Sequence, residues 1–235
     1  MILFLSRPYD SGPSPDVYDP VFENNEWAAI IEACHADEVP DTWVADGTCY
    51  KDMLINGTNY RIDIIGKNHD DLADGTGKAP LTFQLHDCYD TIFRMNTTIT
   101  NVGGWRDCEM RTRAMPILKA EMPAEVQAGI RPVNKLTSAG GQSSSIVTTS
   151  DELFLPSEVE VFGSITNSFS GEGTQYEYYQ AGNSKVKNWK GSAYNWWERS
   201  PLFDGSASYC RVTSNGTVSF NTANMAFGVP FCFCF

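Results

Sequence analysis

The first regular pattern of apolar residues along the chain is helical. Apolar side chains recur at helical spacing from Trp27 to Cys34, with Asn24 ahead of them as a cap and Pro40 after them as a stop. We therefore predict a short amphipathic helix that ends at about Ala36.

The pattern then changes to the period of a strand. Two apolar runs, 53–55 and the alternating run 60–64, are separated by Asn56 and Gly57. An Asn-Gly pair between apolar runs is the strongest short-range signal for a β-hairpin, because both residues tolerate a positive φ. We predict a hairpin here and another strand over 81–85.

The middle of the chain mixes both periods. We predict, in chain order, a helix over 106–119 that is bent or restarted at Pro116, a helix over 123–128, a strand over 132–136, a loop rich in Ser, Thr and Gly over 137–149, a strand over 153–155 and a helical turn near 157–160.

The C-terminal stretch, residues 196–235 and called the tail below, has a pattern of its own. It opens with Trp196 and Trp197, continues through short polar and aromatic segments that glycines interrupt, and ends in alternating aromatics and cysteines. We interpret the tail as a display surface that is held at both ends by aromatic residues.

Helical and strand periods alternate along the chain, which has no internal repeat. A chain of 235 residues with 42% hydrophobic and 20% charged residues can bury one substantial core. We predict a single α+β domain over residues 23–235. Residues 1–22 contain four prolines and are expected to form an extended arm, which can join the domain to a larger assembly.

The charge of the chain argues against nucleic acid as a partner. The formal net charge is −12, and no cluster of Lys and Arg overrides it locally. The apolar run at residues 1–5 is too short for a signal peptide or a membrane span. We expect no nucleic-acid binding, no membrane insertion and no secretion signal.

The seven cysteines are an odd number and form no CxxC pair. In a chain without a secretion signal we expect most of them to be buried free thiols that act as small hydrophobes. Cys232 and Cys234 have the period of a strand. We prefer a strand face to a metal site there, because no His lies nearby in sequence to complete a ligand set.

No catalytic motif stands out. The three histidines lie in unrelated contexts, and the GxSxG, HExxH, P-loop and GxGxxG patterns are absent. Asp70, Asp71 and Asp74 offer oxygen ligands for calcium, but the spacing of an EF-hand loop is missing, so a solvated loop is the favoured interpretation. We expect no catalytic residue, no cofactor and no metal site.

The composition of the tail is unusual. Residues 200–235 contain no Lys, Glu, Gln or Trp and one Met, although these five types make up about a sixth of the chain. One explanation is that the tail codons derive from AAC or AAT by randomisation of the two adenines. Such codons encode fifteen residue types and none of those five. The alternative explanation is that a short β-rich segment favours Ser, Thr, Phe and Val.

Short motifs in a fixed order along the chain are a second unusual feature of the sequence. They extend from about residue 27 to the C-terminus and read NGT (56–58), IIG (64–66), NHD (68–70), TFQ (82–84), GGW (103–105), MR (110–111), LFLP (153–156), EVFG (160–163), QYEYY (175–179), WWERSP (196–201), SNG (214–216), GVP (228–230) and FC (233–234). This ordered set resembles the variable proteins of diversity-generating retroelements, a group of formally unknown function that is frequent in gut bacteria and their phages.

The resemblance implies a C-type-lectin-like fold, similar to that of the formylglycine-generating enzymes, with short helices and small antiparallel sheets. In such a fold, variable residues lie on a solvent-facing surface that fixed core residues hold. Two residues depart from the family pattern. Glu198 stands where an apolar residue is more common, and Cys232 stands where Gly or Ala is usual.

Two sets of positions follow within the tail. The expected fixed framework is Trp196, Trp197, Pro201, Val212, Val218, Ala223, Val229 and Phe233. The expected variable, ligand-binding positions are Phe203, Asp204, Ser206, Ser208, Tyr209, Arg211, Thr213, Thr217, Ser219, Phe220, Asn221, Asn224 and Phe227. Their alternation with framework residues would place many of them on the outer face of strands. Phe203, Tyr209, Arg211, Phe220 and Phe227 are the expected anchors for a ligand.

The leading hypothesis is a non-enzymatic binding protein, typically a phage-tail receptor-binding protein that recognises a host-surface protein or glycan. Its arm would contact other virion tail proteins, and a homo-oligomer is compatible with the sequence. A phage-encoded chain would lie in the virion, and a bacterial one in the cytoplasm. The alternatives are a structural phage-tail component and an enzyme of the same broad fold with a reactive Cys210, Cys232 or Cys234.

Overall fold

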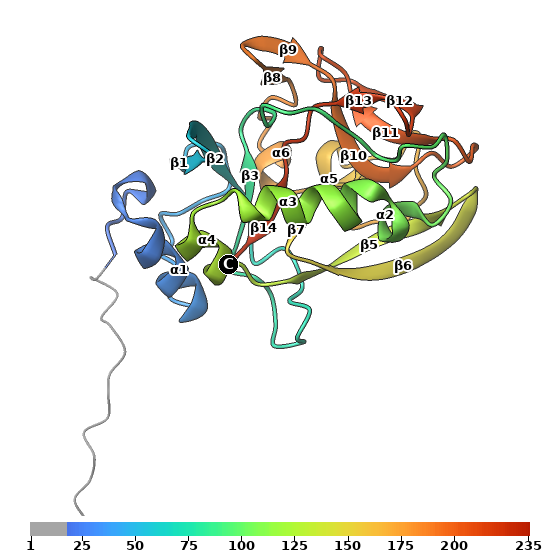
Figure 1. Cartoon of the computed structure of the whole chain (residues 1–235). Helices are drawn as coiled ribbons and strands as arrows, with labels where there is room; N and C mark the ends of the chain where they lie inside the picture. The colour runs from blue at the N-terminus through green and yellow to red at the C-terminus, as the bar shows by residue number, and fades with distance from the viewer. Residues whose placement is uncertain (1–17) are drawn as a thin grey trace, which may run out of the picture.

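The computed structural model describes residues 18–235 (Figure 1). The helices are α1 (Trp27–His35), α2 (Gly104–Asp107), α3 (Met115–Ala120), α4 (Ala124–Gly129), α5 (Glu158–Phe162) and α6 (Glu177–Gln180), with a 3-10 turn at Phe22–Asn24 and a π-helical turn at Met110–Ala114. The first strands are β1 (Tyr50–Ile55), β2 (Thr58–Lys67), β3 (Leu81–Leu85), β4 (Phe93–Arg94), β5 (Val133–Gly140), β6 (Ser143–Asp151) and β7 (Leu153–Phe154). The later strands are β8 (Lys187–Trp189), β9 (Ser192–Tyr194), β10 (Trp196–Pro201), β11 (Ser208–Val212), β12 (Val218–Thr222), β13 (Ala226–Phe227) and β14 (Cys232–Cys234). The expected mixture of short helices and small antiparallel sheets is confirmed.

The largest sheet has the strand order β1-β2-β3-β14-β7, and all of its neighbouring strands are antiparallel. The last strand of the chain therefore lies inside the sheet, between β3 and β7 (Figure 1). Phe233 of β14 stacks on Phe83 of β3 with ring centroids 5.2 Å apart, and Trp27 of α1 packs against Phe83 and Phe235. The end of the tail is thus part of the main core.

Several local predictions are confirmed. The β1–β2 hairpin turns at Asn56 and Gly57, which have φ values of 46° and 81°, as a type I′ turn requires. Helix α1 occupies the first predicted helix, but the expected cap at Asn24 is wrong: Asn24 lies in the preceding 3-10 turn, and Glu26 precedes α1 without a side-chain capping bond. The predicted strand over 81–85 is β3, and Ser157 caps α5 in a capping box with Glu160.

The long helix expected over 106–119 is divided differently. The break falls at Cys108, whose backbone is extended, and the chain then runs through the π-helical turn directly into α3. Pro116 lies in the first turn of α3, directly after the π-helical turn, so the helix changes type next to the proline and the expected restart at Pro116 is confirmed in part.

The prediction of an irregular loop over 137–149 is wrong. Residues 133–151 form the long β5–β6 hairpin, which reverses at Gly141 and Gln142 with φ values of 60° and 67° (Figure 1). Much of β6 is exposed, so its strand character rests on ladder hydrogen bonds rather than on apolar alternation. A search for hydrophobic periodicity therefore misses it.

The expected arm over 1–22 lies mostly outside the described residues. Residues 18–22, the last part of the expected arm, are described. Tyr18 and Phe22 are buried there, and the ring centroids of Phe22 and Trp43 lie 5.2 Å apart. The packed domain therefore begins no later than Tyr18, ahead of the predicted boundary at residue 23. None of the helices within 18–235 combines the length and apolar character that a membrane crossing needs.

Candidate ligand-binding surface

The tail begins on a buried, charged foundation. Every residue of β10 is buried, including Arg199, whose guanidinium donates to the Glu160 carboxylate and to the backbone oxygens of Leu155, Leu136 and Glu172. These bonds connect β10 to α5 and β5. These hydrogen bonds therefore hold β10, the first strand of the tail, in one position.

A second buried cation completes this foundation. The ammonium of Lys135 lies 2.6 Å from Asp70 and 2.7 Å from Glu160, and it also donates to the Tyr176 hydroxyl. Burial alone would raise the pKa of Glu160, but Arg199 and Lys135 lower it overall. Because each buried charge has a partner, the network holds β5, α5 and β10 in one geometry.

Above this foundation β10, β11 and β12 form a three-stranded antiparallel sheet with β11 in the middle. Arg211 of β11 lies opposite Trp197 on one side and Ser219 on the other. The register of β10 shifts between Trp197 and Pro201. Strand β12 forms the outer edge, at the upper right of Figure 1, and its residues are half-exposed along most of its length.

The thirteen predicted positions fall into three groups. The exposed residues are Phe203, Asp204, Ser206, Thr217 and Phe220. The half-buried residues are Arg211, Thr213, Ser219, Asn221 and Asn224. The buried residues are Ser208, Tyr209 and Phe227. Of the predicted framework, all but the half-buried Val218 are buried.

Two expected anchors are core residues. The Tyr209 ring is fully buried and its hydroxyl donates to the backbone oxygen of Gly104 at 2.9 Å. Phe227 packs its ring 4.9 Å from that of Trp197 and pairs with Phe93 of β4. The expectation of alternating inner and outer positions assumed that one face of each strand meets solvent, but most of β11 is covered on both faces.

The first tail loop, residues 202–207 between β10 and β11, has its backbone fixed by hydrogen bonds to a buried side chain. Asn101, itself fully buried, donates from its amide to the backbone oxygens of Gly205 and Ser208, and its backbone N–H reaches Ser206. The ring of Phe203 is 41% exposed and meets solvent beside Phe169. This loop therefore presents an aromatic side chain on a fixed backbone.

The second exposed aromatic lies on the edge strand. Phe220 of β12 is 48% exposed, and the hairpin that leads into β12 is closed between Thr213 and Thr217 by backbone and hydroxyl hydrogen bonds. Gly216 has a φ of 75° in this turn. The β11–β12 hairpin thus places Phe220 and Thr217 on the surface.

The sequence reasoning missed a neighbouring aromatic pair. The β8–β9 hairpin carries Trp189 and Tyr194, both half-exposed, with ring centroids 5.0 Å apart. Tyr194 lies 6.4 Å from Phe227, so Trp189, Tyr194 and Phe227 form a continuous row, called the aromatic row below. The available signal was Lys190 and Gly191, which form the positive-φ turn between two short strands.

Comparison with known proteins gives a family for this fold. A family model described as a domain of unknown function, DUF6273, matches residues 82–235. The chain belongs to the DUF6273 family. The DUF6273 match starts at the second residue of β3 and includes both the β8–β9 hairpin and the whole tail. No curated protein and no solved structure matches the chain.

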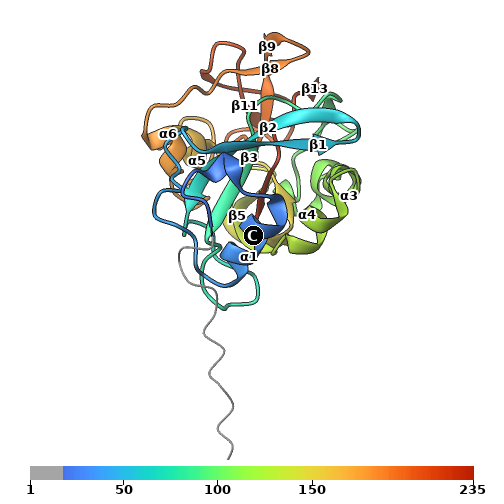
Figure 2. The same ribbon diagram turned by 90° about the vertical axis from the view of Figure 1, so that its left-hand side faces the viewer.

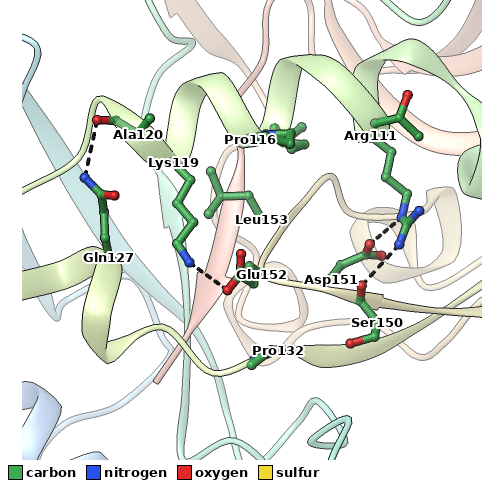
Figure 3. Close-up of a pocket in the computed structure, with 12 residues that line it drawn as sticks. Arg111, Pro116, Lys119, Ala120, Gln127, Pro132, Ser150, Asp151, Glu152 and Leu153 are labelled. Atoms are coloured by element: carbon green, nitrogen blue, oxygen red, sulfur yellow. Dashed lines mark hydrogen bonds and ion pairs between the residues drawn. The ribbon is translucent and has the colours of Figure 1, made fainter. Parts of the chain in front are cut away.

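One large groove of this DUF6273 domain lies elsewhere. It has a volume of about 690 Å³ and runs between α3 and the β6–β7 segment (Figure 3). Figure 3 shows Arg111 directed at Asp151 and Lys119 directed at Glu152, so its main charges already neutralise each other. None of the thirteen predicted positions lines this groove.

The cysteines and the acidic loop offer little chemistry. All seven cysteines are free; Cys210, Cys232 and Cys234 are fully buried, and burial raises the pKa of each thiol. The loop carboxylates diverge, because Asp70 pairs with Lys135, Asp71 with Lys78 and Asp74 with Arg131. Within residues 18–235 no three His, Cys, Asp or Glu side chains gather as a metal-ligand set.

Proposed function

We propose that this DUF6273 protein is a non-enzymatic ligand-binding protein with a C-type-lectin-like fold, whose tail displays a surface diversified by a retroelement. The ligand would be a protein or glycan of a host cell surface, and a phage-tail receptor-binding protein is the role that fits this best.

One observation carries the proposal. Within one short segment, the tail combines a buried framework with two exposed aromatics, Phe203 at 41% and Phe220 at 48%. An exposed Phe on a rigid backbone loses little conformational entropy when it is covered, which is why aromatic anchors dominate recognition surfaces. The residue types that the tail lacks and the ordered motifs support the diversification part of the proposal.

The alternative of a cysteine-dependent enzyme has weaker support. Attack by sulfur requires an accessible thiolate, whereas Cys210, Cys232 and Cys234 are fully buried. A structural component of a phage tail is a distinct alternative. In that case Phe203 and Phe220 would be buried between copies of the chain. The oligomeric state of the purified protein, with and without these two side chains, separates it from the proposal.

The direct test measures binding of the purified full chain to intact candidate host cells. We expect Phe203→Ala combined with Phe220→Ala to weaken binding by about tenfold or more, since each change removes a central aromatic contact. The matched control is Leu54→Ala combined with Ile117→Ala, two side chains exposed by 60% and 54% outside the tail. Equal binding by both double variants to a host that the wild type binds would refute the proposal.

A further inference from the structure

Arg211 stands apart from the other residues of the predicted surface. It is the only Lys or Arg in residues 200–235 of a chain whose net charge is −12. Its side chain is half-buried in the middle strand of the tail sheet, between Trp197 and Ser219 in the register. A positive charge has thus been placed at the centre of an otherwise nearly uncharged segment.

This charge has no counterion in the described part of the chain. No carboxylate of residues 18–235 forms an ion pair with Arg211, whereas most other arginines in that range have one. Its one hydrogen bond runs from Nε to the backbone oxygen of Phe220 at 3.4 Å, and Nη1 is shielded from solvent without an acceptor. Burial lowers the pKa of Arg211 from its usual value. A partly desolvated cation without a partner costs free energy that an anion can recover.

The guanidinium is also held in place. Its central carbon lies 5.0 Å from the ring centroid of Phe227, which in turn packs against Trp197 and Tyr194. Stacking of this kind fixes the plane of the group, and a planar, two-oxygen acceptor that reached the unpaired Nη1 would complete its hydrogen bonds. A carboxylate has that shape.

The surroundings indicate the rest of the ligand. Phe227 is one end of the aromatic row, and at the other end Lys190 lies 4.9 Å over the ring of Trp189. Trp189 and Tyr194 are half-exposed, and half-exposed rings suit a ligand that alternates C–H faces with hydroxyl groups, as sugar rings do.

We propose that Arg211 binds a carboxylate of the ligand, and that the ligand is an acidic glycan whose sugar rings pack along Trp189 and Tyr194, the half-exposed part of the aromatic row. The proposal rests on the proposed function of the tail and specifies its ligand class. Sialic and uronic acids carry the same carboxylate chemistry and differ in their sugar ring, so the probes include both.

The test uses the full chain and two matched pairs of probes. Sialyllactose is compared with lactose, and a galacturonate oligomer with its methyl ester, by calorimetry at low and physiological salt. We expect binding of at least one acidic probe and none of its neutral counterpart. Arg211→Gln should weaken that binding by about tenfold or more, with Arg211→Lys intermediate because it keeps the charge but loses the planar fork. Arg113→Gln, which removes the same charge from an exposed side chain outside the tail, should leave it unchanged.

Folding is checked by thermal unfolding of each variant, and Phe227→Leu serves as a second variant that keeps Arg211 but removes its stacking partner. That variant should also bind the acidic probe more weakly. Equal binding of acidic and neutral sugars, no binding of either acidic probe, or full binding by Arg211→Gln would overturn the proposal. Binding of a polyglutamate peptide in place of the sugars would overturn the glycan assignment.

The two proposals fail separately. If the Phe203 and Phe220 double variant loses host-cell binding while Arg211→Gln keeps it, the tail is a binding surface and the carboxylate site is wrong. If the double variant keeps host-cell binding, the proposed function is wrong, whatever the sugar titrations show.

Discussion

At the scale of single residues, the tail contains a buried carboxyl that nothing in the described chain satisfies. Glu198 of β10 is fully buried, and neither of its oxygens has a hydrogen-bond partner among residues 18–235. Burial, together with the nearby Glu158 and Glu172, raises its pKa well above the usual value. The folded protein therefore favours the neutral form of this side chain. Glu198 is, with Cys232, one of the two residues that depart from the pattern expected from the resemblance.

This carboxyl makes stability depend on pH in a defined direction. A carboxyl whose folded pKa exceeds its unfolded pKa stabilises the fold below the unfolded value, and this contribution is lost as pH rises toward the folded value. Between the unfolded pKa and the raised folded pKa, Glu198 therefore lowers the unfolding free energy by about 1.4 kcal/mol per pH unit. Burial raises the pKa of Glu172 to about 7. Glu172 therefore also lowers the unfolding free energy as pH rises, and this effect ends near pH 7.

We expect Glu198→Gln to unfold at a higher urea concentration than the wild type at pH 8, and the advantage should shrink at pH 5. Gln keeps the shape of the neutral acid and has no proton to lose. Glu125→Gln, on the exposed side of α4, is the matched control and should follow the wild type at both values. An advantage of Glu198→Gln that stays constant between pH 5 and pH 8 would contradict the assignment.

At the scale of elements, one buried amide connects two hairpins. The Asn101 side chain accepts from the backbone N–H of Gly141 in the β5–β6 turn, and donates to Gly205 and Ser208 in the tail. The backbone approaches closely there, since a side-chain carbon on Gly140 would lie 1.8 Å from the oxygen of Asn101. The shape of the first tail loop thus depends on a hairpin that precedes it by more than fifty residues.

We expect Asn101→Ala to lower the unfolding free energy by about 2–4 kcal/mol, because it leaves buried backbone groups of both hairpins unsatisfied. Hydrogen exchange should accelerate selectively in residues 202–208 and 140–142. The control Asn59→Ala removes an exposed amide that bonds Asp52 and should change neither quantity. Unchanged exchange in the tail loop of Asn101→Ala would show that the loop is held by other contacts.

Which of these elements the sequence could reveal depends on what stabilises each one. The β1–β2 hairpin was predictable, because Asn56 and Gly57 determine the turn by their own conformational preferences. The β5–β6 hairpin was not, because its exposed Ser and Thr residues are ordered by ladder bonds to a partner strand rather than by burial. The same limit applies to the site. Exposure of Phe203 and Phe220 agreed with the expectation, but burial of Tyr209 and Phe227 depends on α2 and β4, which are distant in sequence.

At the scale of the whole molecule, the tail is both core and surface. Its final strand lies inside the main sheet, and its first strand lies on the buried Arg199 and Lys135 network. Between these fixed ends, the loop and the edge strand reach solvent beside the β8–β9 hairpin (Figures 1 and 2). Such an arrangement allows sequence change at the surface without loss of the fold, which is what a diversified binding protein needs.

The proposal that a retroelement diversifies the tail can be tested by deep sequencing of the tail-coding segment in a population that carries the gene. The genomic neighbourhood of the gene is sequenced as well. We expect a near-copy of the segment beside a reverse-transcriptase gene, with substitutions confined to adenine positions. They should be frequent at exposed codons such as those of Phe203 and Phe220, and rare at Trp197 and Phe233 of the framework. Substitutions spread evenly over framework and surface codons, without a neighbouring template, would contradict the proposal.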